Sequence, residues 1–203
     1  MSQTDYKAPA DWTEWTYLDL AMAPLTPEAE AFFLAQNDPQ IRQGLAENQT
    51  LSRDALRVLS EDEDDEVRAI VAENPDLYAV LTPDEVIAFI DGNAEVLSGV
   101  ALICNDQAII DRLTEEFLTA EDPELRGALA TCVGLSKETM DVLVQDEAYE
   151  VRAGLISNEV FHDVYGEDFV RDFVGDDPDM QDVYDEYCQL TAMCEEYCDL
   201  ASR

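Results

Sequence analysis

The amino-acid sequence predicts an all-α fold, a short α-solenoid of paired helices with capping helices at both ends. Three observations lead to this fold class. An apolar segment recurs along the chain every 26 to 29 residues, helix-start motifs precede the apolar stretches between its copies, and no stretch shows the sustained period-two alternation of a strand.

The recurring segment gives the first helix of each repeat. Its five copies begin at Ile41, Val67, Val96, Leu125 and Val151, so successive starts are 26, 29, 29 and 26 residues apart. Each copy has apolar residues four positions apart with small residues between them, which is typical of a helical face packed closely against its neighbours. The second apolar residue of each copy is therefore the expected core: Leu45, Val71, Val100, Leu129 and Leu155.

A second helix is expected after most copies of the segment. Thr82-Pro83-Asp84-Glu85 carries the residues of a capping box, with proline at the first helical position. Apolar stretches with the same role run from Ser52 to Leu59, Ala108 to Leu113 and Ser136 to Val144. Acidic turns, several of them punctuated by proline or glycine, separate the repeats.

The two ends of the chain differ from its middle, as the caps of a solenoid do. Helix starts are predicted at Asp11-Trp12-Thr13-Glu14 and at Thr26-Pro27-Glu28, and one long helix is predicted from Pro178 to Ala201. We therefore expect a single domain over residues 1–203. Its parts are N-terminal capping helices over 11–36, helical repeats over 37–165 and an acidic C-terminal capping region over 166–203.

Two units resemble the leucine-rich repeat variant family, and the resemblance extends over roughly residues 33–158. The matching motifs are Asp38-Pro39 followed by Ile41-Arg42, Leu45-Ala46 and Asn48, then Val67-Arg68, Val71-Ala72 and Asn74-Pro75, and later Val151-Arg152 with Asn158. The third unit departs from the pattern, because Leu97 stands in the arginine position. The resemblance implies a right-handed superhelix of short helices related to HEAT repeats.

Charge is the most distinctive property of the composition. The chain has 47 acidic and 11 basic residues, a formal net charge of -36. Repulsion excludes nucleic acid and anionic membranes as direct partners. At one charge per ~1.7 Å of duplex, a charge of this size corresponds to roughly 60 Å of DNA. A stack of about six helical layers, each ~8–10 Å thick, would have a similar length.

The sequence gives no sign of secretion or of a cofactor. The N-terminal ten residues contain no basic region followed by an apolar one, so a cytoplasmic location is expected. Five cysteines without a CxxC pair are expected to be free buried thiols. Cys188, Cys194 and Cys198 share one helix, and zinc is the alternative there, but their spacing matches no zinc pattern. We expect no metal and no cofactor.

No residue pattern indicates catalysis. His162 is the only histidine and has no local nucleophile motif, and no phosphate-binding glycine loop occurs, so an enzyme is not expected. The recurring arginines Arg42, Arg68, Arg126 and Arg152 are expected to hold acidic turns and helix carbonyls of adjacent units. An anion-binding ladder is the alternative for this set.

The acidic surface is the candidate partner-binding site. It comprises Glu61, Asp62, Glu63, Asp64, Asp65, Glu66, Asp176, Asp177, Asp179, Asp182, Asp185 and Glu186. The first six lack the ligand spacing and glycine of a calcium loop, and taken alone they fit a solvated turn. Asp179, Asp182 and Glu186 form a stripe opposite the apolar side of the last helix.

Three functions agree with these features. The first is an acidic DNA mimic that binds and inhibits a basic, DNA- or RNA-binding protein, in the manner of antirestriction or anti-CRISPR decoys. The second is an α-solenoid scaffold that holds a protein or peptide without mimicking DNA. The third is a salt-adapted protein, whose acidity serves hydration and solubility. The sequence favours the first and names no particular partner.

Overall fold

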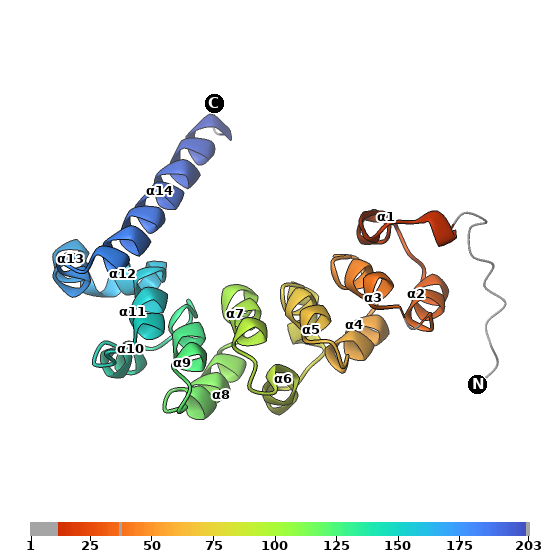
Figure 1. The fold of residues 1–203 in the computed structure, drawn as a ribbon, viewed down its shortest axis with the longest axis horizontal. Coiled ribbons are helices and arrows are strands. Elements are labelled where there is room, and N and C mark those ends of the chain that lie inside the picture. Colours follow the sequence, from red (N-terminus) through yellow and green to blue (C-terminus); the bar gives the residue numbers. More distant parts are fainter. Residues whose placement is uncertain (1–11, 37, 202–203) are drawn as a thin grey trace. The chain divides into compact units, whose positions relative to one another are not determined.

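The computed structural model of the chain describes residues 12–36 and 38–201. All regular elements in these ranges are helices, and no strand occurs among them, which confirms the all-α fold class (Figure 1). In chain order they are η1 (Trp12–Glu14), α1 (Tyr17–Met22), α2 (Pro27–Leu34), α3 (Pro39–Ala46), α4 (Arg53–Ser60), α5 (Asp65–Ala72), η2 (Pro75–Ala79), α6 (Pro83–Ile90), α7 (Ala94–Ile103), α8 (Gln107–Phe117), α9 (Pro123–Ala130), α10 (Lys137–Leu143), α11 (Tyr149–Ile156), α12 (Glu159–Tyr165), α13 (Glu167–Val174) and α14 (Pro178–Ala201).

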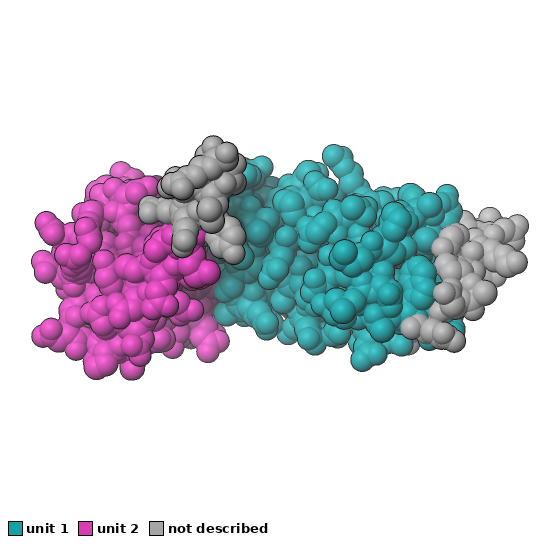
Figure 2. Space-filling view, turned by 90° about the horizontal axis from the view of Figure 1, so that it is seen from above, with its two compact units in different colours: residues 1–112 teal, residues 113–203 magenta. Residues whose placement is uncertain are grey.

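The chain divides into two compact units (Figure 2). Unit 1 comprises residues 1–112 and unit 2 comprises residues 113–203, so α8 begins in one unit and ends in the other. None of the helices in the described part of the chain is long and apolar enough to cross a membrane.

Unit 1 is built from two layers of helices. The odd-numbered helices α1, α3, α5 and α7 pack side by side in one layer, and α2 and α4 pack beside each other in the other (Figure 1). In unit 2, α9 packs against α11, and α11 also contacts α10, α12 and α14. The first helices of the predicted repeats are α3, α5, α7, α9 and α11.

Small residues let these helices approach closely. A Cβ atom at Gly44 of α3 would lie 2.8 Å from the carbonyl oxygen of Tyr17 in α1, and one at Gly127 of α9 would lie 2.7 Å from the carbonyl oxygen of Glu150 in α11. Any larger residue at either position would push the two helices apart. The small residues of the recurring segment are therefore contact points between neighbouring repeats.

The expected core is confirmed. Leu45, Val71, Val100, Leu129 and Leu155 are all fully buried, with no exposed surface. The predicted helix starts at Thr26, Ser52, Thr82 and Ser136 are also confirmed, since each side chain accepts a hydrogen bond from a backbone N–H of the first helical turn. The long C-terminal helix has the predicted limits, Pro178–Ala201.

The N-terminal prediction needs one correction. Trp12–Glu14 forms a single 3-10 turn, and α1 begins only at Tyr17. Thr16 and Asp19 form a capping box there, so the cap lies at Thr16 and not at Asp11. Asp11 lies outside the described residues.

The sequence analysis also omitted two short helices of unit 2. They are α12 and α13, which are separated by Gly166, and α13 ends at Gly175; both glycines have positive φ. Asn158 caps α12 through a bond from the backbone N–H of Val160.

Candidate functional site

Part of the acidity of the turns has a structural role. Asp38, Asp64 and Asp122 occupy equivalent positions and are the N-caps of α3, α5 and α9, with Asn93 in the same role for α7. Each side chain accepts a hydrogen bond from a backbone N–H of the first helical turn. A carboxylate at this position also interacts favourably with the helix dipole. These residues are thus required by the fold whatever the chain binds.

The same holds for much of the run from Glu61 to Glu66. Asp62 forms a largely buried ion pair with Arg42 at 2.7 Å. Asp65 accepts from Arg68 at 2.6 Å and from Asn93 at 2.9 Å. Glu61 and Glu63 are exposed. Asp65 and Glu66 are exposed as well, but Asp65 is held by the two contacts above and Glu66 accepts from Gln43. The run is therefore a structured turn that does not present six free charges.

The six acidic residues of the C-terminal region lie at the start of α14. Asp177 lies 3.7 Å from Arg152 and accepts from the backbone N–H of Asp179, and Asp185 accepts from Gln181 at 3.1 Å. Asp179, Asp182 and Glu186 are exposed and line a shallow hollow together with Tyr149 and Val183; Asp176 is exposed as well. These three residues lie on one side of the helix, as the predicted stripe requires.

The recurring arginines hold turns and carbonyls, as the sequence predicts. Arg42 pairs with Asp62, and Arg126 pairs with Asp146 at 2.6 Å, in both cases 20 residues further along the chain. Arg126 also donates to the carbonyl oxygen of Ala120 at 2.7 Å.

The other two arginines of this set bond mainly to backbone. Arg68 donates to the carbonyl oxygen of Asp62 at 3.0 Å, and Arg152 donates to the carbonyl oxygen of Phe173 at 2.8 Å. All four side chains are at most a quarter exposed. They are therefore occupied within the fold and do not form an open ladder of cations.

Other cations of the described chain are paired as well. Arg57 pairs with Glu85, Arg112 with Asp84, Lys137 with Asp141 and Arg171 with Glu167. The Arg126 guanidinium lowers the pKa of Asp146, and the Lys137 ammonium group lowers the pKa of Asp141. The positive charges of these pairs are thus neutralised locally, and of the described cations only the exposed Arg53 has no ion pair. The surplus carboxylates determine the field around the protein.

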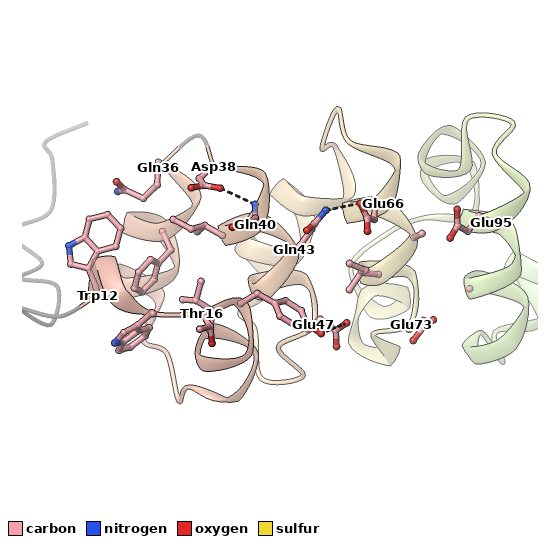
Figure 3. A pocket seen from close by; sticks show the side chains of 18 of the residues that line it. Trp12, Thr16, Gln36, Asp38, Gln40, Gln43, Glu47, Glu66, Glu73 and Glu95 are labelled. Carbon is pink, nitrogen blue, oxygen red and sulfur yellow. Dashed lines mark hydrogen bonds between the residues drawn. The ribbon is translucent and has the colours of Figure 1, made fainter.

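A large hollow in the described structure is a groove on the odd-numbered helices of unit 1. It has a volume of about 1200 Å³ and runs from Trp12 across α1, α3, α5 and α7 to Leu102 (Figure 3). Among the described residues, its lining contains no lysine or arginine and five acidic residues, which are Asp38, Glu47, Glu66, Glu73 and Glu95. We call this hollow the acidic groove.

The carboxylates of the acidic groove form two rows. Glu66 and Glu95 lie along one side, and Glu47 and Glu73 lie along the other (Figure 3). Glu66 and Glu95 each immediately precede the first apolar residue of their repeat, while Glu47 and Glu73 each immediately precede the asparagine at its end. All four are exposed, and Ala69, Ser98 and Gly99 line the groove as well.

Aromatic side chains close one end of the acidic groove. Trp15 stacks on Phe33 with ring centroids 5.6 Å apart, and Trp12 meets Phe32 edge to face at 5.2 Å. Both tryptophans are half-buried and both line the groove. The hydroxyl of Tyr17 donates to Glu47 at 3.4 Å, and the Glu47 carboxylate raises the pKa of this tyrosine.

His162 and the described cysteines show no catalytic arrangement. The His162 ring stacks on Tyr187 with centroids 3.9 Å apart, and its Nε2 lies 2.6 Å from the carbonyl oxygen of Ile156. Cys104 and Cys132 are buried, and burial raises the pKa of the Cys132 thiol. No group of three or more potential metal ligands occurs in the part of the chain that the structure describes.

One prediction about the cysteines is wrong. Cys188 was expected to be a buried thiol but is exposed, because residues 188–190 of α14 are all exposed and this stretch of the helix is not covered. The side chains of Cys194 and Cys198 lie outside the described residues.

Of the four groove glutamates, the sequence analysis selected only Glu66. Glu47, Glu73 and Glu95 were omitted because isolated acidic residues attract less attention than a run of six. The signal that identifies them is the repeat alignment itself, which places each beside an equivalent residue of another repeat.

Comparison with protein-family models, curated proteins and solved structures finds no match for this chain.

Proposed function

We propose that this chain is a non-enzymatic binding protein that occupies the basic, nucleic-acid-binding surface of another protein as a decoy for DNA or RNA. One observation carries the proposal. The arginines and Lys137 named above are held in ion pairs within the chain, while exposed carboxylates on both units have no such partner, in a protein of net charge -36.

The decoy acts through electrostatic complementarity. A dense negative surface steers a basic partner into contact and competes with the phosphates that normally occupy the partner's site. Nucleic acid itself is repelled, so the partner is a protein. Cys104 and Cys132 are buried and form no disulfide, which suits a reducing compartment, and we place this action in the cytoplasm.

The proposed scaffold is a right-handed α-solenoid with repeats of the leucine-rich repeat variant or HEAT type. Its support is that equivalent residues make equivalent contacts in the two units. Arg42 and Arg126 each pair with an aspartate 20 residues later. Asn48 and Asn158 each donate to a backbone carbonyl at the end of the preceding odd-numbered helix, α1 and α9 respectively.

A second candidate function is a scaffold that grips a peptide, and the acidic groove favours it. The two functions differ in what they demand of the surface. A decoy uses many carboxylates and depends steeply on salt, whereas a scaffold depends on a few apolar or aromatic contacts and responds weakly to salt.

The decoy is tested by capture and competition. The full-length chain is immobilised, basic proteins are captured from a lysate and eluted with rising salt, and each captured protein is then titrated with labelled duplex in the presence of this chain. The decoy predicts mutual exclusion of duplex and chain. A stable ternary complex of partner, duplex and chain would rule the decoy out, and so would capture that does not change with salt.

Matched variants locate the binding surface. Asp179→Asn, Asp182→Asn and Glu186→Gln remove three exposed charges from α14, and we call this triple substitution the α14 variant. Glu28→Gln, Asp54→Asn and Asp76→Asn remove three exposed charges from unit 1 and serve as the control. The α14 variant should bind the captured partner on the order of tenfold more weakly, and the control should bind as the unaltered chain does.

A further inference from the structure

The acidic groove has a strongly one-sided charge. Of the lining residues that the structure describes, five are acidic and none is a lysine or arginine. In the described structure Glu73 and Glu95 have no ion pair. Glu47 and Glu66 accept hydrogen bonds only from neutral groups, the hydroxyl of Tyr17 and the side-chain amide of Gln43 respectively. A hollow lined by negative charges concentrates a negative potential, so the molecule that it binds must carry positive charge.

The carboxylates follow the repeat of the helices. Each side of the groove offers a glutamate on two successive odd-numbered helices: Glu66 and Glu95 on α5 and α7, and Glu47 and Glu73 at the ends of α3 and α5. Packed helices lie ~8–10 Å apart. An extended chain rises about 3.1–3.4 Å per residue, so three of its residues span about 10 Å. In the polyproline II conformation every third side chain also points the same way. Cations three residues apart therefore match the spacing of the two glutamates on one side of the groove.

The aromatic end favours arginine over lysine. Trp12 and Trp15 present half-buried ring surface to the groove and are fixed in place by Phe32 and Phe33. A planar guanidinium stacks on such a surface while it pairs with a carboxylate. Between the two glutamate rows, the small side chains of Ala69, Ser98 and Gly99 leave room for a peptide backbone.

We propose that the acidic groove binds an extended segment of a partner protein, roughly nine residues long, with arginine at about every third position. The proposal rests on the proposed function for the sign of the partner's charge, and it adds the site and the register of binding. The groove lies wholly within unit 1, so the site does not require the carboxylates of α14.

Tryptophan fluorescence of the full-length chain reports on this site directly. The protein has two tryptophans, and both line the groove. The probes are two nine-residue peptides without aromatic residues: three repeats of Arg-Pro-Pro, and an isomer with its three arginines together followed by six prolines. The two have the same composition and charge. The spaced peptide should shift the emission and bind several-fold more tightly than the clustered one.

Two variants of equal charge separate the groove from general attraction. The groove variant carries Glu47→Gln, Glu66→Gln, Glu73→Gln and Glu95→Gln. The control carries Asp54→Asn, Glu63→Gln, Asp76→Asn and Asp91→Asn, which are exposed residues of unit 1 outside the groove lining. The groove variant should bind the spaced peptide on the order of tenfold more weakly, and the control within about twofold of the unaltered chain.

Several results would overturn the proposal. They are equal affinity for the two peptides, equal loss in the two variants, or binding without a change in emission. Melting curves of both variants establish that they fold, and the pair Glu73→Gln and Glu95→Gln alone provides a milder version if the full set does not. The α14 variant separates this proposal from the decoy. If it loses the captured partner yet binds the spaced peptide normally, the groove is a peptide site whatever the fate of the decoy.

Discussion

The side-chain amide of Asn158, in the turn after α11, donates a hydrogen bond to the carbonyl oxygen of Cys132 at 2.9 Å, and a second to that of Ala130 at 2.9 Å. Its Oδ1 accepts from the backbone N–H of Val160 and so caps α12. Asn158 is 1% exposed. One buried amide thus joins the end of α11 to the end of α9 and starts the next helix.

Replacing this amide should destabilise the fold. Asn158→Ala leaves two buried carbonyl groups without their donor and removes the cap of α12, which together should cost about 3 kcal/mol of unfolding free energy. Asn158→Asp keeps the cap oxygen but loses the donor, so it isolates the link to α9. Urea unfolding measures both variants. A loss below about 0.5 kcal/mol for Asn158→Ala would mean that the amide does not hold the repeats together.

Arg126 should contribute more to stability than an exposed arginine. It pairs with Asp146 and donates to the carbonyl oxygen of Ala120, with the side chain only 17% exposed. Arg126→Ala should therefore cost about 2 kcal/mol. Arg57→Ala is the control, because its pair with Glu85 is nearly half exposed and should contribute less to stability than the Arg126 contacts do. Equal losses of stability in the two variants, measured by thermal unfolding, would show that the Arg126 contacts contribute no more than an exposed ion pair.

The sequence predicted these arginine contacts only in part, and repeat length explains the difference. Arg42 and Arg126 lie in 26-residue units, where the aspartate 20 positions later reaches the guanidinium. Arg68 lies in a 29-residue unit that contains η2, and it pairs with Asp65 of its own helix. Among the described residues its buried Nε has no hydrogen-bond partner. The alignment of the repeats shows that this unit is three residues longer, but it does not show that the unit contains the 3-10 helix η2.

The sequence could predict which residues line the acidic groove, but it could not predict that they line one hollow. Periodicity identified the odd-numbered helices and their buried positions, because burial of one face repeats every turn. It also places Glu47 beside Glu73 and Glu66 beside Glu95 in the alignment. That these four line one hollow depends on how far apart neighbouring helices lie, which is fixed by small residues such as Gly44 and Gly99 acting over long sequence distances.

Helix capping offers a paired test. Asp122 caps α9 through the backbone N–H of Glu124, whereas the equivalent position before α11 is Ala148, which makes no side-chain cap. Asp122→Ala should destabilise by about 1 kcal/mol, and Ala148→Asn should stabilise by a similar amount without adding charge. Urea midpoints measure both. A neutral or destabilising Ala148→Asn would show that the partly buried site has no space for the longer side chain.

Glu85 should make the stability of the fold depend on pH in the acidic range. Hydrogen bonds from Thr82, together with the Arg57 guanidinium, lower the pKa of Glu85 to about 2. Because the folded pKa lies below the unfolded one, its contribution is complete above about pH 4.5 and disappears as the pH falls towards 2. The melting temperature of Glu85→Gln should therefore lie below that of the unaltered chain at pH 7, with a gap that closes between pH 4.5 and 2. A gap that stays constant down to pH 2 would contradict the shift.

The exposed acids of α14 should lower stability through their mutual repulsion. Asp182 and Glu186 are four residues apart and exposed, and like charges at this spacing destabilise a helix by about 0.2–0.5 kcal/mol. Asp179 differs, because it lies in the first helical turn, where the helix dipole favours a negative charge. Substituting Asp182→Asn and Glu186→Gln should thus stabilise the protein, while Asp179→Asn should be neutral or slightly destabilising.

Salt identifies the cause of this stabilisation. Screening shortens the Debye length to about 3 Å at 1 M, so the gain from Asp182→Asn and Glu186→Gln should be largest at low ionic strength and vanish at 1 M salt. The unaltered chain should itself melt at a higher temperature as salt rises, since its net charge of -36 repels itself less. Unfolding curves of the two proteins at 10 mM and 1 M sodium chloride measure both effects. A gain in stability that persists unchanged at 1 M salt would indicate that helix propensity or packing causes it. The α14 carboxylates would then no longer count as mutually repelling charges that are available to a basic partner.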